Sequence, residues 1–296
     1  MFGRRPDGKR LSDIDPIIQI TPYLMPMRCD AQVFLQHNLD YEKMSRYIVS
    51  KSKEGEKLTF MQIIIAAYVR AASHHPEINR FIFNKQYYSR KNLTVSYAVL
   101  KDPQNPESSE TTVKIFFDPA DTIFDVRDRM NHAVETTRAT QDGDFVIKLA
   151  KFVLKIPGFA TFIVGLYRLL DRYGIAPGFL IRELPFYCGL FVTNNGSIGL
   201  PSPLHHIYNF GNVSLFMGIG GVQKEAVVEG DKTRMRRVMP LGITADERVC
   251  SGAHYSAFFA EVMHYIANPR ELEVPPEEIK FDKGVEYHVP KISKPE

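Results

Sequence analysis

The sequence predicts a mixed α/β (α+β) fold for a chain of 296 residues, and two observations support this. First, segments with apolar residues at helical spacing alternate with short segments rich in β-branched and aromatic residues. Second, hydrophobic residues make up 44% and charged residues 24% of the chain, which is usual for globular proteins and excludes a disordered chain. No shift in composition marks a boundary between two domains, so we expect one large domain.

The N-terminal region is predicted to pass from an arm into a strand and a helix. Residues 1–14 are polar and basic, and we expect them to form an extended arm. Residues 21–35 are predicted to form a strand, of which Pro26 restricts one end to a sheet edge or a bulge. Asp40 is suited to cap a helix that continues to about Ser50, because its carboxylate can accept a hydrogen bond from the first turn.

The next region is predicted to form a buried helix followed by a hairpin. Residues 59–74 are apolar on nearly every side, which indicates a helix in the core that ends before Pro76. A hairpin is expected over 81–88, with Asn84 and Lys85 in its turn. Two further strands are predicted, over 92–101 and 111–117.

The second half of the chain continues the alternation. Asp121 is expected to open a helix whose apolar stripe consists of Ile123, Val126, Met130 and Val134. Three strands are predicted over 190–194, 214–221 and 232–244. A helix is expected over 255–267. The C-terminal residues 276–296 are rich in Pro and Glu and are expected to form a tail on the surface.

Residues 145–172 form an unusual hydrophobic segment. Lys148, Lys151 and Lys155 fall on one helical stripe, and Pro157-Gly158 interrupts the apolar run. The lysines and this break argue against a membrane-spanning helix, which needs about 20 uninterrupted apolar residues. Three roles stay open: packing across an oligomer, lining a pocket for an apolar acyl group, or peripheral contact with an anionic membrane surface.

Several kinds of chemistry are excluded by the sequence. The three cysteines have the wrong number and spacing for a disulfide framework or a zinc site, so no metal is expected. Gly218, Gly220 and Gly221 lack the GxGxxG spacing and are expected to mark a strand end where two backbones approach closely. A net charge of +3 is too small for a nucleic-acid binder. The N-terminus lacks the apolar core of a signal peptide, so we predict a cytoplasmic protein.

Two adjacent histidines, His205 and His206, are candidates for a catalytic base. Successive side chains of a regular strand point to opposite faces, so both rings cannot face one site from a strand. One of them could still act as a base from a loop, and the alternative is a purely structural role.

The segment ITADERVCSGAHYSAFF (243–259) resembles the active-site segment TADHRVxDGAxxAxFL of the dihydrolipoamide acyltransferases, the cores of the 2-oxo acid dehydrogenase complexes. Three upstream segments resemble the same family in the same order: MRCDAQVFL (27–35), HHPEIN (74–79) and LFVTNNGSIG (190–199). The resemblance covers residues 15–275, within which the segment 145–172 has no clear counterpart. The sequence has no lipoyl domain, so it resembles the freestanding bacterial type.

This resemblance implies the chloramphenicol acetyltransferase-like fold, a mixed sheet with flanking helices assembled as a homotrimer. It also implies acyl transfer between coenzyme A and a thiol or hydroxyl acceptor, in a channel between subunits. The coenzyme A thioester would be a co-substrate, with no bound cofactor. In the family, a His abstracts the acceptor proton, an Asp four residues later fixes the local structure, and a Ser or Thr hydroxyl helps to hold the oxyanion.

The sequence departs from this pattern at the His and the Asp positions. Glu247 stands at the position of the His, Ser251 at that of the Asp, and Thr193 or Asn194 near that of the hydroxyl. An unperturbed Glu has a pKa about two units below that of His, so its carboxylate is the weaker base unless burial raises the pKa. Two functions therefore stay open: an acyltransferase-type protein, or a catalytically inactive trimeric binding or scaffold protein on the same fold.

An active site could also use a rearranged catalytic pair. We expect the Glu247 carboxylate to face a channel at the subunit interface, near Thr193 or Asn194 and near His205 or His206 of a neighbour. There the carboxylate could orient the imidazole and raise its basicity, so that the histidine would become the base.

Overall fold

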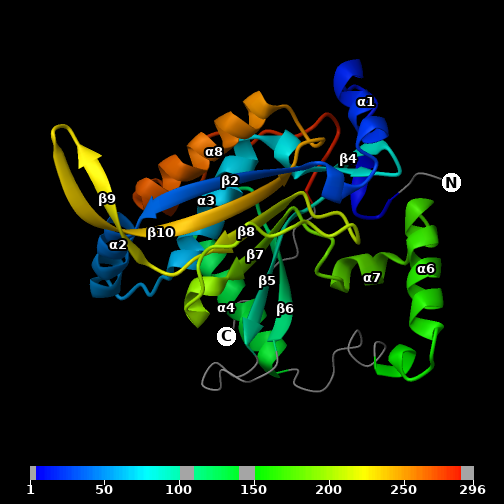
Figure 1. The fold of residues 1–296 in the computed structure, drawn as a ribbon, viewed down its shortest axis with the longest axis horizontal. Helices are drawn as coiled ribbons and strands as arrows, with labels where there is room; N and C mark the ends of the chain where they lie inside the picture. The colour runs from blue at the N-terminus through cyan, green and yellow to red at the C-terminus, as the bar shows by residue number, and fades with distance from the viewer. Residues whose placement is uncertain (1–4, 101–109, 140–150, 288–296) are drawn as a thin grey trace.

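The computed structural model describes residues 5–100, 110–139 and 151–287. In this part of the chain, seven strands form a mixed sheet in the order β2-β10-β8-β7-β5-β6, with β9 paired to β10 (Figure 1). Strand β7 runs parallel to β5 and β8, and the other neighbouring pairs are antiparallel. The strands are β2 (Gln32–Asp40), β5 (Leu93–Leu100), β6 (Glu110–Phe117), β7 (Leu190–Asn194), β8 (Leu215–Ile219), β9 (Gln223–Glu229) and β10 (Lys232–Asp246).

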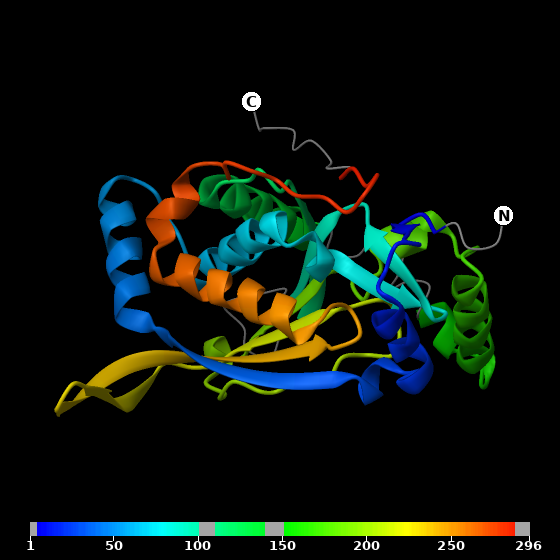
Figure 2. The same ribbon diagram turned by 90° about the horizontal axis from the view of Figure 1, so that it is seen from above.

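Helices cover one face of this sheet (Figure 2). They are α2 (Tyr41–Lys53), α3 (Phe60–His74), α4 (Ile123–Ala139) and α8 (Gly252–Ala267). The predicted helix over 59–74 is confirmed, and Thr59 forms a capping box with Gln62 at its start. The predicted cap of α2 is also confirmed, since the Asp40 carboxylate accepts from the Lys43 backbone N–H at 3.0 Å. The main hydrophobic core lies between these helices and the sheet.

Helix α4 begins differently from the prediction. Its first turn is capped by Thr122, whose hydroxyl accepts from the Asp125 backbone N–H at 3.3 Å. The Asp121 carboxylate instead accepts from the Arg129 side chain at 2.7 Å and from the Asp118 backbone N–H at 2.8 Å. The expected apolar stripe starts at Ile123 as predicted, because the shift of the cap by one residue leaves the helical spacing unchanged.

The opposite face of the sheet is covered by the irregular segment 200–213. Ile207 packs there in a small cluster with Phe191 and Phe216. The close approach predicted at the 218–221 glycines is confirmed, because a Cβ on Gly218 would lie 2.8 Å from Pro203. At Gly242 a Cβ would lie 2.3 Å from the Pro203 carbonyl oxygen, so the segment sits directly on the backbone of two strands.

A second, three-stranded sheet lies at one end of the molecule. It has the order β1-β4-β3, formed by β1 (Gly8–Arg10), β3 (Arg80–Phe83) and β4 (Gln86–Arg90). The predicted hairpin is confirmed, with positive φ angles of 47° at Asn84 and 61° at Lys85. Two consecutive residues of this conformation match the twist of an antiparallel pair. Part of the expected N-terminal arm thus adds a strand to this sheet.

The strand predicted over 21–35 is wrong except at its last four residues. Residues Pro16–Leu24 form helix α1, and β2 begins only at Gln32. The helix starts because the Asp15 carboxylate accepts from the Ile17 backbone N–H at 2.7 Å and Pro16 occupies the first helical position. The prediction also missed β9, which pairs with the first half of β10 around Gly230.

The hydrophobic segment forms helices broken at the predicted position. Residues 151–154 are helical, Gly158 has a φ of 79°, and α6 then spans Phe159–Arg172. A short helix, α7 (Gly178–Glu183), follows. Lys148 and the rest of 145–150 lie outside the described residues. Within the described ranges, no helix combines the length and the apolar character needed to cross a membrane.

Candidate active site

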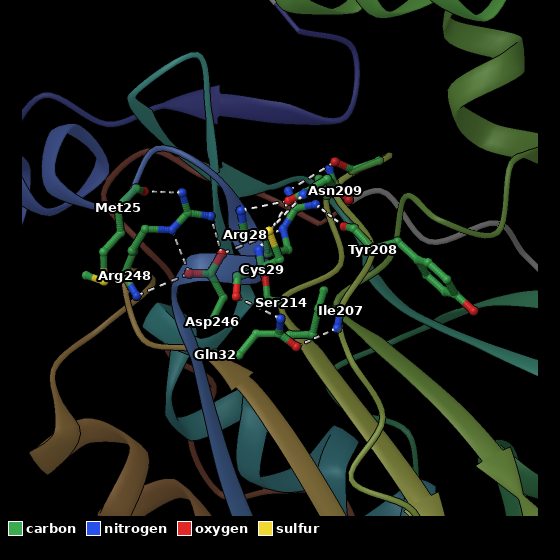
Figure 3. Close-up of polar contacts among 12 residues, drawn as sticks. Met25, Arg28, Cys29, Gln32, Ile207, Tyr208, Asn209, Ser214, Asp246 and Arg248 are labelled. Carbon is green, nitrogen blue, oxygen red and sulfur yellow. Dashed lines mark hydrogen bonds and ion pairs between the residues drawn. The ribbon is translucent and has the colours of Figure 1, made fainter. Parts of the chain in front are cut away.

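The candidate site lies at the turn that joins β10 to α8. Its centre is the buried carboxylate of Asp246, the last residue of β10 (Figure 3). Arg248 forms a two-point ion pair with it, from Nε to Oδ1 at 2.8 Å and from Nη2 to Oδ2 at 2.7 Å. Arg28 Nε lies 3.6 Å from Asp246 Oδ2. Two guanidinium groups therefore hold one buried carboxylate, which keeps the turn rigid.

The two arginines also connect this turn to distant segments. Arg28, in the connection before β2, donates to the backbone oxygens of Tyr208 at 2.7 Å and Gly211 at 3.0 Å. Arg248 donates to the Met25 backbone oxygen at 2.9 Å. The α1–β2 connection, the segment 200–213 and the β10–α8 turn are therefore held in one arrangement by charge-assisted hydrogen bonds.

Burial affects the two guanidinium groups differently. It lowers the pKa of Arg28 to about 10, an effect that the nearby Asp246 carboxylate only partly offsets. Burial also acts to lower the pKa of Arg248, but its bonds to Asp246 outweigh this and raise the pKa above the ordinary value. Both groups thus remain charged at neutral pH, so the ion pairs persist there.

Glu247 projects from this rigid turn. Its backbone N–H donates to the Ala31 oxygen at 2.9 Å, while its side chain is exposed. Among the described residues, no hydrogen bond or ion pair engages its carboxylate. The backbone is therefore fixed, and the carboxylate is free to meet a substrate or a neighbouring molecule.

Ser251 has a structural role that the sequence analysis did not assign to it. It is the N-cap of α8, where its hydroxyl accepts from the His254 backbone N–H. The same hydroxyl lies 2.6 Å from His254 Nδ1, and His254 Nε2 lies 3.8 Å from Glu77 Oε1. The sequence analysis missed His254, although a histidine three residues after an N-cap serine is placed to reach it.

Thr193 and Asn194 lie at the other end of the sheet from Glu247. They pair with Gly218 and Ile219 at the end of β8, whereas Ala245 pairs with Leu215 at its start. Four residues of strand separate these points, about 13 Å along the sheet. Within one chain, Thr193 and Asn194 therefore lie far from Glu247. The Thr193 hydroxyl is buried and has no hydrogen-bond partner among the described residues.

His205 and His206 lie nearer to the Glu247 end, on the face covered by segment 200–213. This segment is irregular, so the alternation of a strand does not apply, and the two rings stack at 4.6 Å. The His205 ring also stacks on Phe216, with ring centroids 4.1 Å apart. His205 Nδ1 lies 2.7 Å from the His206 backbone oxygen. Because a carbonyl oxygen only accepts, Nδ1 carries the proton and Nε2 of the neutral ring can act as a base.

Among the described residues, no group of three or more His, Cys, Asp or Glu side chains is arranged to hold a metal ion. The groups that the turn offers are the exposed Glu247 carboxylate, the exposed His254 imidazole and the half-buried Ser251 hydroxyl. These groups can accept, donate and transfer protons.

Residues 189–274 match the family model of the 2-oxoacid dehydrogenases acyltransferase catalytic domain. None of the curated proteins compared with the chain gives a significant match. The matched range contains every candidate site residue named from the sequence.

Several solved structures share the fold. A probable dihydrolipoamide acetyltransferase from Listeria monocytogenes 4b F2365 has a TM-score of 0.56 at 13% identity, covering 88% of this chain and 95% of that one. The cubic core of a pyruvate dehydrogenase multienzyme complex has a TM-score of 0.56 at 14% identity, covering 88% and 93%. The dihydrolipoamide acetyltransferase of Azotobacter vinelandii, whose catalytic mechanism was studied at a serine, a histidine and an asparagine, has a TM-score of 0.55 at 14% identity and the same coverage. The chain thus resembles the 2-oxoacid dehydrogenase acyltransferase catalytic domain, by sequence over residues 189–274 and by fold over most of its length.

Proposed function

We propose that the protein transfers an acyl group between coenzyme A and a thiol or hydroxyl acceptor. One observation carries this proposal: the family match covers a turn in which Glu247 is exposed on a backbone held by the buried Asp246–Arg248 pair and Arg28.

The reaction needs a base at the acceptor. The base removes the proton of the acceptor S–H or O–H, and the resulting anion attacks the thioester carbonyl carbon. The tetrahedral intermediate then expels the coenzyme A thiolate, which takes up a proton. We assign the proton transfer to Glu247 acting with His205 or His206, which lie toward the same end of the sheet, as a carboxylate that orients an imidazole. His254, hydrogen-bonded to Ser251, is a second imidazole close in sequence to the same turn.

The separation of the site residues favours a ring of protomers. Glu247 and the Thr193–Asn194 pair lie at opposite ends of the sheet, so they meet only if one end of a protomer contacts the other end of its neighbour. Such a heterologous contact closes into a ring when the rotation permits. We therefore propose a homotrimer with the channel between its subunits. Light scattering that shows a stable monomer at micromolar concentration would contradict this assembly.

A pocket near the Asn194 end suits the acyl donor. It has a volume of about 290 Å³ and lies between β2, Pro201–Ser202 and β10. The hydrogen-bonding side chains that line it are Gln36, His37, Asn38, Ser202 and Gln223. These groups suit a chain that carries amides, such as the pantetheine arm of coenzyme A. The cytoplasmic location remains a prediction from the sequence.

The decisive experiment follows the release of coenzyme A from acetyl-coenzyme A with dihydrolipoamide as acceptor. We expect Glu247→Gln to lower the rate by about 100-fold or more, the usual contribution of a proton-transfer group. A matched control is Glu278→Gln, since the Glu278 carboxylate is also exposed, with 71% of the side chain accessible. His205→Gln and His206→Gln identify the responsible histidine. Combined with Glu247→Gln, the substitution of that histidine should cause no further loss of rate, because Glu247 and the histidine act as a unit.

The second candidate function is a catalytically inactive trimeric scaffold or binding protein. It is favoured by the presence of Glu at the family's histidine position and by the use of Ser251 as a helix cap. Wild-type protein that forms a trimer but releases no coenzyme A with thiol or hydroxyl acceptors would support this function. A rate unchanged by Glu247→Gln would instead remove Glu247 from the mechanism.

A further inference from the structure

Helix α6 carries an exposed apolar stripe. Phe162, Leu166, Leu169 and Tyr173 follow one another at i, i+4, i+7 and i+11, which places them on one line of the helix and its C-cap. Their exposed fractions are 63%, 41%, 51% and 47%. Side chains of this size are normally buried in a globular protein, so the stripe forms a contiguous apolar surface open to solvent.

The opposite face of α6 is firmly attached to the protein. Asp171 is buried and accepts a hydrogen bond from Arg5 Nη1 at 2.6 Å and another from the Tyr187 hydroxyl. The Tyr167 ring packs against Phe210, with centroids 5.7 Å apart. The exposed stripe is therefore presented by an anchored helix.

The apolar surface continues before α6. Phe152, Leu154 and Ile156 are exposed by 57%, 72% and 48%. The ring of Phe159 links the two parts, since it packs edge-on against Phe152 at 6.3 Å and stacks with Phe162 at 6.5 Å. The turn at Gly158 thus bends the chain without interrupting the apolar surface.

The charges of this segment are almost all positive. Between residues 151 and 183, the exposed charged side chains are five cations and one carboxylate: Lys151, Lys155, Arg168, Arg172, Arg182 and Glu183. The other carboxylate, Asp171, is buried against Arg5. On the helix, Arg172 lies about 90° round from the apolar stripe, and Arg168 lies about 130° round, with its guanidinium 6.0 Å from the Phe210 ring. An apolar line on one face with cations on the polar face is the pattern of helices that lie in the interface of an anionic bilayer.

Helix α1 presents a second exposed stripe at the same end of the molecule (Figure 2). Ile17, Ile20 and Leu24 are exposed by 79%, 50% and 71%. Both helices contact the β3–β4 turn. The Lys85 ammonium lies 4.6 Å from the centroid of the Tyr23 ring of α1, and Arg172 of α6 donates to the Asn84 side chain at 3.2 Å.

We propose that this end of the molecule docks on an anionic lipid surface, with the stripe of α6 in the interface and its cations against the lipid phosphates. A lipid surface fits better than a second copy of the chain. Two copies of this segment would bring five exposed cations on each side together with only one exposed carboxylate on each side. An anionic lipid surface instead offers a negative charge for every cation. Helix α6 has 14 residues, too few to span a bilayer but enough to lie along one. The proposal does not rest on acyl transfer.

Flotation of the full chain with phosphatidylcholine vesicles, with and without phosphatidylglycerol, tests this inference. We expect binding only to the anionic vesicles and a decrease of binding at high salt. The double variant Arg168→Gln/Arg172→Gln should bind about 30-fold more weakly, since each cation near the surface contributes about fivefold. Phe162→Ser/Leu166→Ser should bind at least about tenfold more weakly. The matched control is Val228→Ser/Met235→Ser, which removes side chains exposed by 72% and 64% on the β9–β10 hairpin.

Three results would overturn the inference. Wild-type protein that fails to float with anionic vesicles excludes the lipid surface. Equal loss of binding in the control variant would mean that no specific stripe is involved. In the third result, the wild type does not bind vesicles, and Phe162→Ser/Leu166→Ser forms a smaller assembly in light scattering. This result would assign the stripe to packing between copies of the chain.

Discussion

The β10–α8 turn and helix α6 both depart from the usual arrangement of a folded protein, the turn by burying charged groups and the helix by exposing apolar ones. At the turn, the charged groups of Asp246, Arg248 and Arg28 are buried and paired with one another. On α6, large apolar side chains are exposed, while the ion pair between Arg5 and Asp171 holds the helix from behind. The comparison teaches that buried ions define the geometry in both places. What they present differs: a free carboxylate at the turn and an apolar stripe on α6.

The largest effect is expected from Asp246→Asn. The substitution removes the charge that two buried guanidinium groups share, so we expect a loss of about 3–5 kcal/mol in the free energy of unfolding. Urea denaturation measures this. The same substitution at the exposed Asp13 is the control and should change stability by less than about 0.5 kcal/mol. A loss below about 1 kcal/mol for Asp246→Asn would show that the arginines are not held by this carboxylate.

A smaller loss is expected from Gly242→Ala, which tests the covering of the sheet beside the turn. The new Cβ would lie 2.3 Å from the Pro203 oxygen, so the segment 200–213 must move, at a cost of about 2–3 kcal/mol. The matching change in the other region is Gly165→Ala, where no atom lies within 4 Å of the new Cβ. In that helix the alanine should stabilise by about 0.5–1 kcal/mol. Similar effects of the two substitutions in thermal unfolding would contradict the contrast between the two regions.

The smallest effect concerns Lys114, which ties the segment behind α6 to the sheet. Its ammonium donates to the backbone oxygens of Ile181 at 2.8 Å and Leu184 at 3.3 Å. Lys114→Met should lower stability by about 1 kcal/mol at neutral pH. Burial lowers the pKa of Lys114 to about 8, below its ordinary value.

The pH dependence of this variant has a defined sign. From about pH 8 up to the ordinary lysine pKa of about 10.4, the unfolded chain binds more protons at this residue than the folded one. The stability of the wild type relative to Lys114→Met must therefore rise with pH in this window. Urea denaturation of both proteins at several pH values measures the difference. A difference that stays constant or falls would mean that Lys114 titrates as an exposed lysine.

Local sequence patterns predicted many of the elements. The capping box at Thr59, the cap at Asp40 and the turn at Asn84-Lys85 each depend on residues only a few positions apart, and each is confirmed. The strand predicted over 21–35 failed because it overlooked Asp15-Pro16, a helix start that lies just outside the apolar run. Strand β9 was missed because its side chains do not alternate clearly, and its conformation depends on pairing with β10.

The candidate site was located in part. The resemblance of 243–259 identified the turn, and Glu247 does project from it. The partnership of Arg28 with Asp246 spans more than 200 residues, and no local spacing signals it. The cap formed by Ser251 and its contact with His254 were also missed, although a pattern three residues apart could have revealed them.

By itself, the sequence determined the helices that cover the sheet, most strands, the break at Pro157-Gly158 and the segment that carries Glu247, because these depend on spacing and turn chemistry within a few residues. Only the tertiary structure decided that Arg28 meets Asp246, that segment 200–213 lies on Gly242, and that the stripe of α6 faces solvent. The physical reason is that an apolar helical stripe has the same spacing whether it is buried or exposed. Which of the two occurs is decided by the surfaces that the rest of the chain leaves available, and here Arg5 fixes the other face of the helix through Asp171.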